Sequence, residues 1–232
     1  MMLSTLILQS LHVALLGLTF ATPVHGSMDY VPNDIHCTKD SHAGFVHNTY
    51  TYIAPLHDFT NLVGSFFNIS WYDGIVVTNT TGADNVPGAS RSGPFNGVTY
   101  NETLTMFTER SDALTFSFIG QGFSYTRSPK GPTMTLDSYT ESMRFESICG
   151  GKATYIDVLT RVCSDNQIEA YDLWYTLHMT TFQNMAVNLG APVLAGDCPL
   201  HCFLIYCGAE KSPCGREWDD NDKQGDTADL MH

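Results

Sequence analysis

Basic residues are scarce in this sequence. Lys and Arg total 11 against 24 Asp and Glu, so the formal net charge is −13. A surface with this balance repels phosphates and anionic lipid headgroups. No cluster of basic residues interleaved with aromatics appears anywhere. We therefore expect no nucleic acid partner.

Several enzyme motifs are also missing. The sequence has no Gly-x-Ser-x-Gly, no His-Glu-x-x-His, no dinucleotide-binding glycine fingerprint and no phosphate-binding loop. Serine hydrolase, zinc protease and nucleotide chemistry are therefore unsupported. We expect no cofactor and no catalytic metal. No segment after residue 26 is apolar enough to span a membrane.

The chain opens with a segment typical of a secretory signal. Residues 1–26 contain no Asp, Glu, Lys or Arg and include an apolar stretch from Val13 to Ala21. Small residues at Ala21 and Gly26 offer cleavage sites, which favours a signal peptide. A membrane anchor is the alternative, but polar residues near Gln9 shorten the apolar run below the length that spans a bilayer.

A secretory route predicts glycans and disulfides. Sequons begin at Asn68, Asn79 and Asn101. An oxidising lumen would pair the seven cysteines and leave one over; these are Cys37, Cys149, Cys163, Cys198, Cys202, Cys207 and Cys214.

The cysteine spacing leaves the pairing open. We expect two bridges among the four cysteines of a Cys-rich and acidic extension, residues 196–232. One more bridge would join Cys37 to Cys149 or Cys163. Zinc binding by the Cys and His residues of the extension is the alternative, but disulfides fit a secreted chain better. Its acidic end is expected to be disordered.

The longest amphipathic run lies between Ser164 and Gly190. Ser164 with Gln167 resembles a capping box, and Gly190 followed by Pro192 is a helix stop signal. Between them apolar and aromatic residues recur at three- and four-residue spacing, which predicts one buried helix face. They are Tyr171, Trp174, Tyr175, His178, Phe182, Met185 and Leu189.

The residues before this helix predict mostly strands. A polar lead-in segment covers 27–47, and Pro55 begins a short helix that Gly64 ends. A second short helix or turn is expected over 65–71. Alternation and turn residues predict strands at 49–54, 75–77, 98–107, 114–119, 123–125, 136–148 and 153–162. Successive strands followed by one long helix imply an antiparallel sheet with helices on one face, which is an α+β fold.

Short motifs in this order resemble a known superfamily. They are Ile53-Ala54-Pro55-Leu56, Leu62-Val63-Gly64, Trp71, Pro87-Gly88-Ala89-Ser90-Arg91 and Thr99-Tyr100-Asn101-Glu102-Thr103-Leu104. Their order and spacing resemble the SRPBCC superfamily of START-like, helix-grip proteins, which includes the birch-pollen-allergen family and polyketide cyclases. The resemblance implies a curved sheet that grips the C-terminal helix over residues 48–195. It also implies a cavity between sheet and helix for lipids, sterols or polyketides.

Glu102 is the first candidate for chemistry in that cavity. If Asn101 carries a glycan it faces solvent, and strand alternation then turns Tyr100, Glu102 and Leu104 inward. Burial would raise the pKa of Glu102 toward the range useful for acid–base catalysis. Alternatively, Glu102 pairs with Arg91 as a structural bridge, or the sequon is unused and the alternation is reversed.

His178 and Glu141 are the other catalytic candidates. His178 lies on the predicted buried helix face, where a neutral imidazole could transfer a proton; a core histidine with one satisfied hydrogen bond is the alternative. Alternation over 136–148 turns Glu141 inward with Tyr139, whereas the face of Asp157 is ambiguous. The expected ligand-binding residues are Tyr100, Leu104, Phe116, Tyr139, Tyr171, Tyr175 and Phe182.

These features predict a secreted START-like protein that encloses an apolar small molecule. We favour an enzyme that cyclises, isomerises or dehydrates a polyketide- or terpenoid-type secondary metabolite without a cofactor. A non-catalytic carrier needs the same apolar walls and remains open. A secreted interaction protein whose tail engages a partner is the third interpretation.

Overall fold

The structure is a computed structural model that describes residues 35–126 and 131–198. The predicted signal peptide, most of the lead-in segment and the extension after Cys198 lie outside the described residues. So do Cys202, Cys207 and Cys214, together with the predicted disorder of the acidic end.

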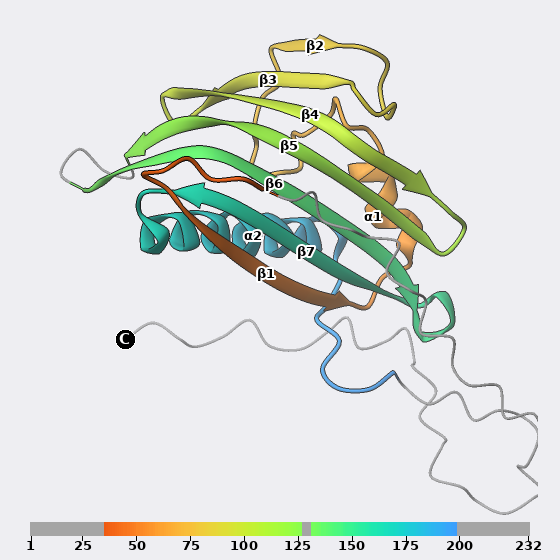
Figure 1. The fold of residues 1–232 in the computed structure, drawn as a ribbon. Coiled ribbons are helices and arrows are strands. Elements are labelled where there is room, and N and C mark those ends of the chain that lie inside the picture. Colours follow the sequence, from red (N-terminus) through yellow and green to blue (C-terminus); the bar gives the residue numbers. More distant parts are fainter. Residues whose placement is uncertain (1–34, 127–130, 199–232) are drawn as a thin grey trace, which may run out of the picture. The chain divides into compact units, whose positions relative to one another are not determined.

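A seven-stranded antiparallel sheet forms most of the described chain (Figure 1). Its order is β1-β7-β6-β5-β4-β3-β2. Each strand from β2 to β7 therefore pairs with the strand next to it in sequence, and β1 is an edge strand that pairs with β7. The strands are β1 (His42–Tyr52), β2 (Asn79–Thr81), β3 (Ser90–Phe95), β4 (Val98–Glu109), β5 (Ala113–Thr126), β6 (Thr133–Ile148) and β7 (Ala153–Ser164). The antiparallel α+β prediction is confirmed.

In the described part of the chain, two α-helices accompany the sheet, α1 (Leu56–Val63) and α2 (Gln167–Leu189). Figure 1 shows α2 running along the inner side of the curved sheet. The Phe182 ring of α2 packs against Phe145 of β6 at 6.1 Å and against Tyr50 of β1 at 4.9 Å. The ring of Phe59 from α1 lies 6.5 Å from Phe145. The sheet therefore grips α2 through an aromatic core, which confirms the helix-grip prediction.

The ends of α2 follow local sequence signals, with one correction. Gly190 takes a left-handed conformation (φ 63°) and ends the helix as predicted, because glycine adopts this conformation without steric cost. The predicted capping box is wrong. Asn166 caps the first turn by accepting from the Glu169 amide, while the Gln167 side chain donates to the main chain of His42.

Other element boundaries differ from the prediction. β1 starts at His42, inside the predicted lead-in segment. The sequence pattern does not reveal this start, because the inward positions Gly44 and Asn48 are not apolar and so interrupt the alternation typical of a strand. Residues 75–77 form no strand and the short β2 follows them. Residues 65–71 form turns, and the segments 114–119 and 123–125 belong to the single strand β5.

Two disulfides tie the ends of the described chain to the sheet. Cys37 pairs with Cys163 of β7, one of its two expected partners. Cys198 pairs with Cys149 in the turn between β6 and β7. The expectation of two bridges within the extension is therefore wrong, because Cys198 is bonded to the sheet. Among the described residues, no helix is both long and apolar enough to cross a membrane.

Candidate functional site

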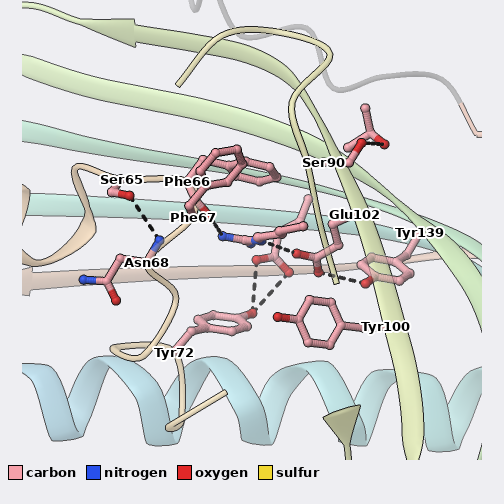
Figure 2. Close-up of polar contacts among 12 residues, drawn as sticks. Ser65, Phe66, Phe67, Asn68, Tyr72, Ser90, Tyr100, Glu102 and Tyr139 are labelled. Carbon is pink, nitrogen blue, oxygen red and sulfur yellow. Dashed lines mark hydrogen bonds and ion pairs between the residues drawn. The ribbon is translucent and has the colours of Figure 1, made fainter. Parts of the chain in front are cut away.

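An ion pair joins two strands on the sheet face that packs against α2. Arg91 on β3 and Glu102 on β4 are register partners, and the Arg91 Nε donates to Glu102 Oε2 at 2.7 Å. A second guanidinium nitrogen donates to the Phe66 carbonyl at 2.6 Å. Tyr139 on β6 donates its hydroxyl proton to Glu102 Oε1 at 2.8 Å. Both carboxylate oxygens of Glu102 thus accept a hydrogen bond (Figure 2).

Burial controls the protonation of Glu102. The residue is 6 % exposed, and loss of hydration raises the pKa of its carboxyl group above the usual value. The charge of Arg91 and the Tyr139 hydrogen bond oppose this shift, whereas the nearby Glu141 adds to it. Because the net direction is upward, Glu102 holds a proton more tightly than an exposed glutamate does.

A second buried carboxylate, Glu141 on β6, has its own hydrogen-bond network. Tyr72 donates to its two oxygens at 3.1 and 3.2 Å, and Thr160 donates to Oε2 at 2.9 Å. The His178 Nε2 lies 3.2 Å from Glu141 Oε2. The His178 Nδ1 donates to the side-chain oxygen of Asn48 at 2.9 Å. Because that oxygen can only accept, the Nδ1 of His178 carries a hydrogen.

The tyrosines beside these carboxylates stay protonated. Burial and the adjacent glutamates raise the pKa of the Tyr72 and Tyr139 phenols well above the usual value. Burial also raises the pKa of Tyr100 to about 12, and its hydroxyl donates to the Val76 carbonyl at 3.1 Å. Figure 2 shows the Tyr72 and Tyr139 rings on either side of the Tyr100 ring. All three phenols are hydrogen-bond donors at neutral pH.

A small cavity lies between Glu102 and α2. Its volume is 20 Å³, room for about one water molecule. Tyr72, Tyr100, Glu102 and Tyr139 line it together with apolar side chains and Trp174 of α2. Glu141 and His178 are not among its lining residues, whereas Tyr72 lines it and donates to Glu141.

A wider space of 110 Å³ adjoins this inner cavity and shares Phe95, Leu173 and Leu177 with it. Its rim carries acidic side chains, among them Asp73 and Glu169. The acidic space therefore lies next to the inner cavity that Glu102 lines, with the shared side chains between the two.

The structure places the predicted ligand-binding residues in three settings. Tyr100 and Tyr139 line the inner cavity. Leu104, Phe116 and Phe182 are buried in the core away from the cavity wall. Tyr171 and Tyr175 are 52 % and 39 % exposed and stack on each other, so their assignment as cavity lining is wrong. The buried face of α2 instead passes through Ala170, Trp174, Leu177, His178, Thr181, Phe182, Met185 and Ala186.

The predicted glycosylation sites and Asp157 lie on other surfaces. Asn68 and Asn79 are exposed and Asn101 is half-buried. Asp157 is buried 2.5 Å from the His47 Nε2. It is the register partner of Arg144, which lies on the sheet face opposite to Glu141, so Asp157 is remote from the cavity.

Comparison with known proteins agrees with this architecture. A family model described as a START domain matches residues 47–167, slightly more than half of the 232-residue chain. The chain belongs to the START-domain family. No curated protein matches this START-domain chain in sequence.

Solved structures with related folds are distant in sequence. A protein from Nitrosospira multiformis is 16 % identical, with 63 % of this chain and 96 % of that chain covered and a TM-score of 0.47. Ara h 8.0201 is 10 % identical, with 64 % and 98 % covered and a TM-score of 0.47. Norcoclaurine synthase from Thalictrum flavum, solved with dopamine and hydroxybenzaldehyde, is 11 % identical, with 71 % and 96 % covered and a TM-score of 0.42. The family assignment does not depend on these likenesses.

Sequence reasoning missed several residues of this candidate site. Tyr72 follows the Trp71 of the matching motif but no periodicity singles it out, and Thr160 and Asn48 reach Glu141 and His178 only through the tertiary fold. Trp174 lies on the predicted buried helix face, and this position could have identified it as a candidate for the cavity wall. Within residues 35–126 and 131–198, no group of three or more His, Cys, Asp or Glu is arranged to hold a metal ion.

Proposed function

We propose that this START-domain protein binds an apolar small molecule between the sheet and α2, and that Glu102 exchanges protons with it. The observation that carries this proposal is a carboxyl group with a raised pKa at the wall of an otherwise aromatic and aliphatic cavity. Such a group removes or donates a proton near neutral pH more readily than an exposed glutamate. The reaction would be an isomerisation, cyclisation or dehydration without a cofactor.

The hydrogen bonds of Glu102 leave it able to act as a base. Each oxygen already accepts one hydrogen bond, but a carboxylate offers about four acceptor sites in total. When Glu102 takes a proton from a carbon atom, the electron pair of that bond moves into the ligand. Return of the proton to a different atom completes an isomerisation, which needs no oxidant or reductant.

Glu141 and His178 act through Tyr72 in this proposal. Tyr72 reaches both the cavity wall and Glu141, so the Glu141–His178 pair fixes the orientation of the Tyr72 phenol. They are positioning residues, because neither lines the cavity.

Ligand entry requires the cavity to widen. Pockets that hold drug-sized ligands have volumes of about 300–1,000 Å³, far above the 20 Å³ found here. Leu173 and Leu177 stand where the inner cavity meets the 110 Å³ space at its mouth. Displacement of these two side chains joins the two volumes.

We also propose that the protein passes through the secretory pathway. Two disulfides in the described residues favour an oxidising compartment, and exposed sequon residues such as Asn68 can carry a glycan without disturbing the core. Peptide mass spectrometry of the secreted protein would show cleavage of residues 1–26 and glycan mass on Asn68. An intact N-terminus and an unmodified Asn68 would contradict the route.

A non-catalytic carrier is the second candidate. The ion pair with Arg91 gives Glu102 a structural role that requires no turnover. In that case the cavity binds its ligand and releases it unchanged.

Proton abstraction from 5-nitrobenzisoxazole separates the two candidates. A base removes its ring C–H proton, the electron pair completes a nitrile, and the N–O bond breaks to give a coloured phenolate. We expect turnover by the wild type, about a hundredfold loss in Glu102→Gln, and no change in the control Glu109→Gln at the exposed end of the same strand. Binding of the neutral fluorophore N-phenyl-1-naphthylamine should survive in both variants. If Glu102→Gln retains full turnover, the assignment of Glu102 is wrong; binding without turnover in any form identifies a carrier.

A further inference from the structure

One donor at the wall of the inner cavity has no acceptor within the described chain. Trp174 is 4 % exposed and lines the cavity, and its indole Nε1 makes no hydrogen bond to any described residue. The three tyrosine hydroxyl groups of the wall all donate hydrogen bonds to other described residues. Tyr72 donates to Glu141, Tyr100 to Val76 and Tyr139 to Glu102. Among the donor groups of these lining residues, the Trp174 N–H is the one without an acceptor in the described chain.

A buried indole N–H normally finds a partner. The nearest aromatic neighbour of Trp174 is Tyr139, whose ring centroid lies 4.9 Å away at an interplanar angle of 48°. An N–H directed at a ring is a weak interaction compared with a hydrogen bond to oxygen. The cavity that Trp174 lines has room for one small polar group, such as a carbonyl oxygen.

We propose that the Trp174 Nε1–H donates a hydrogen bond to an oxygen acceptor of the bound ligand. This inference rests on the proposed function and narrows its ligand class to an apolar, largely aromatic molecule that carries a carbonyl oxygen. Trp174 then determines specificity, because a ligand without the acceptor leaves the buried donor unpaired.

The same contact serves the chemistry proposed for Glu102. Trp174 and Glu102 line the same cavity, and Tyr139, which packs on Trp174, donates to Glu102. When Glu102 removes a proton from the carbon next to the carbonyl, the C–H electron pair forms a C–C double bond. The carbonyl π pair moves onto oxygen, where the indole N–H stabilises the negative charge.

Two matched naphthalenes test the inference. 2-Acetylnaphthalene and 2-isopropenylnaphthalene have nearly the same shape, but the first carries a carbonyl group where the second carries a methylene group. In ¹H–¹⁵N spectra, the three tryptophans of the chain give three indole signals, which Trp174→Phe and Trp71→Phe assign by deletion. Trp71 is the matched control, because its Nε1 also lacks a partner among the described residues but it does not line the inner cavity.

The ketone should move the Trp174 indole proton downfield in the wild type, and the alkene should not. Isothermal titration should show that the wild type and Trp71→Phe prefer the ketone by about three- to tenfold, and that Trp174→Phe binds both compounds equally. The inference is overturned if Trp174→Phe keeps the preference, or if bound ketone leaves the signal unmoved. Failure of both compounds to bind any form would overturn the proposed function as well, so the two failures are distinguishable. The spectra of the wild type test the contact even if a variant does not fold.

Discussion

Replacement of Arg91 by methionine tests how the buried ion pair controls Glu102. Arg91→Met removes the charge that opposes the burial shift of Glu102 while it keeps an unbranched side chain between the Phe66 and Phe118 rings, which lie 4.1 and 5.0 Å from the guanidinium. Glu102 then remains buried with the Tyr139 hydrogen bond alone. Its pKa in the folded state should rise further above the value in the unfolded state.

The sign of the pH dependence follows from that rise. A group whose pKa is higher in the folded than in the unfolded state binds its proton more tightly when folded, so stability is highest at low pH. It falls as pH rises through the interval between the two pKa values, at most by about 1.4 kcal/mol per pH unit. In Arg91→Met this interval extends to higher pH than in the wild type. The cost of the substitution should therefore grow with pH.

The magnitude has two parts. Loss of the hydrogen bond to the Phe66 carbonyl and of the cation–π contacts costs about 1–3 kcal/mol at any pH. Removal of one partner from a buried ion pair costs about 3–5 kcal/mol in total while the other partner is charged. We therefore expect the destabilisation to be larger at about pH 8 than at about pH 5 by about 2 kcal/mol.

Urea unfolding at both pH values measures this difference, with the wild type as reference at each pH. Arg91→Met/Glu102→Gln should recover at high pH most of the stability that Arg91→Met loses. Arg144→Met, which breaks the half-exposed pair with Glu146, is the matched control and should cost less than about 1 kcal/mol. An Arg91→Met cost that is equal at the two pH values, or a double variant no more stable than the single one, would refute the reasoning.

Two further substitutions test the support of the site. A Cβ added at Gly120 would fall on the Tyr139 ring, so Gly120→Ala should destabilise the fold by about 1–3 kcal/mol in urea unfolding and weaken proton abstraction by Glu102; an unchanged unfolding midpoint would contradict this packing. Cys37→Ala/Cys163→Ala should lower the free energy of unfolding by about 2–4 kcal/mol without loss of ligand binding. If the variant is as stable as the oxidised wild type, there is no disulfide at this position.

Local patterns in the sequence predict the frame of the fold well. The alternation around Asn101 turns Glu102 and Leu104 to the buried face of β4, as the structure shows. Gly190 ends α2 through its own backbone freedom, and the Asn96-Gly97 turn joins β3 to β4. These features depend on residues adjacent in sequence, so no tertiary information is needed to find them.

The two helix tyrosines show where a helical pattern is insufficient. Tyr171 and Tyr175 fit the spacing of the buried face, yet they lie at its solvent-exposed border while Leu177 and Ala170 are buried. A tyrosine tolerates such a border because its ring is apolar and its hydroxyl is polar. Spacing alone therefore predicts that the helix has a buried face. It defines the residue at the middle of that face only to within about one position.

The polar network depends on contacts that sequence spacing cannot predict. Glu141 meets Tyr72 and His178, which lie 69 and 37 residues away in sequence. The Cys149–Cys198 bridge likewise depends on the path after α2. There the Ile53 amide donates to the Pro192 carbonyl and the Leu194 amide donates to Thr51, so the chain returns along β1.

Ligand binding in the space between the sheet and α2 is the central claim, and a plugged variant tests it most directly. Leu173 lines both the inner cavity and the space at its mouth, so Leu173→Trp should fill the entry path. Val187→Trp places the same side chain on α2 at a position that is 78 % exposed. In titrations with N-phenyl-1-naphthylamine, the wild type and Val187→Trp should bind the fluorophore and Leu173→Trp should not. Equal binding by all three folded proteins would contradict the account.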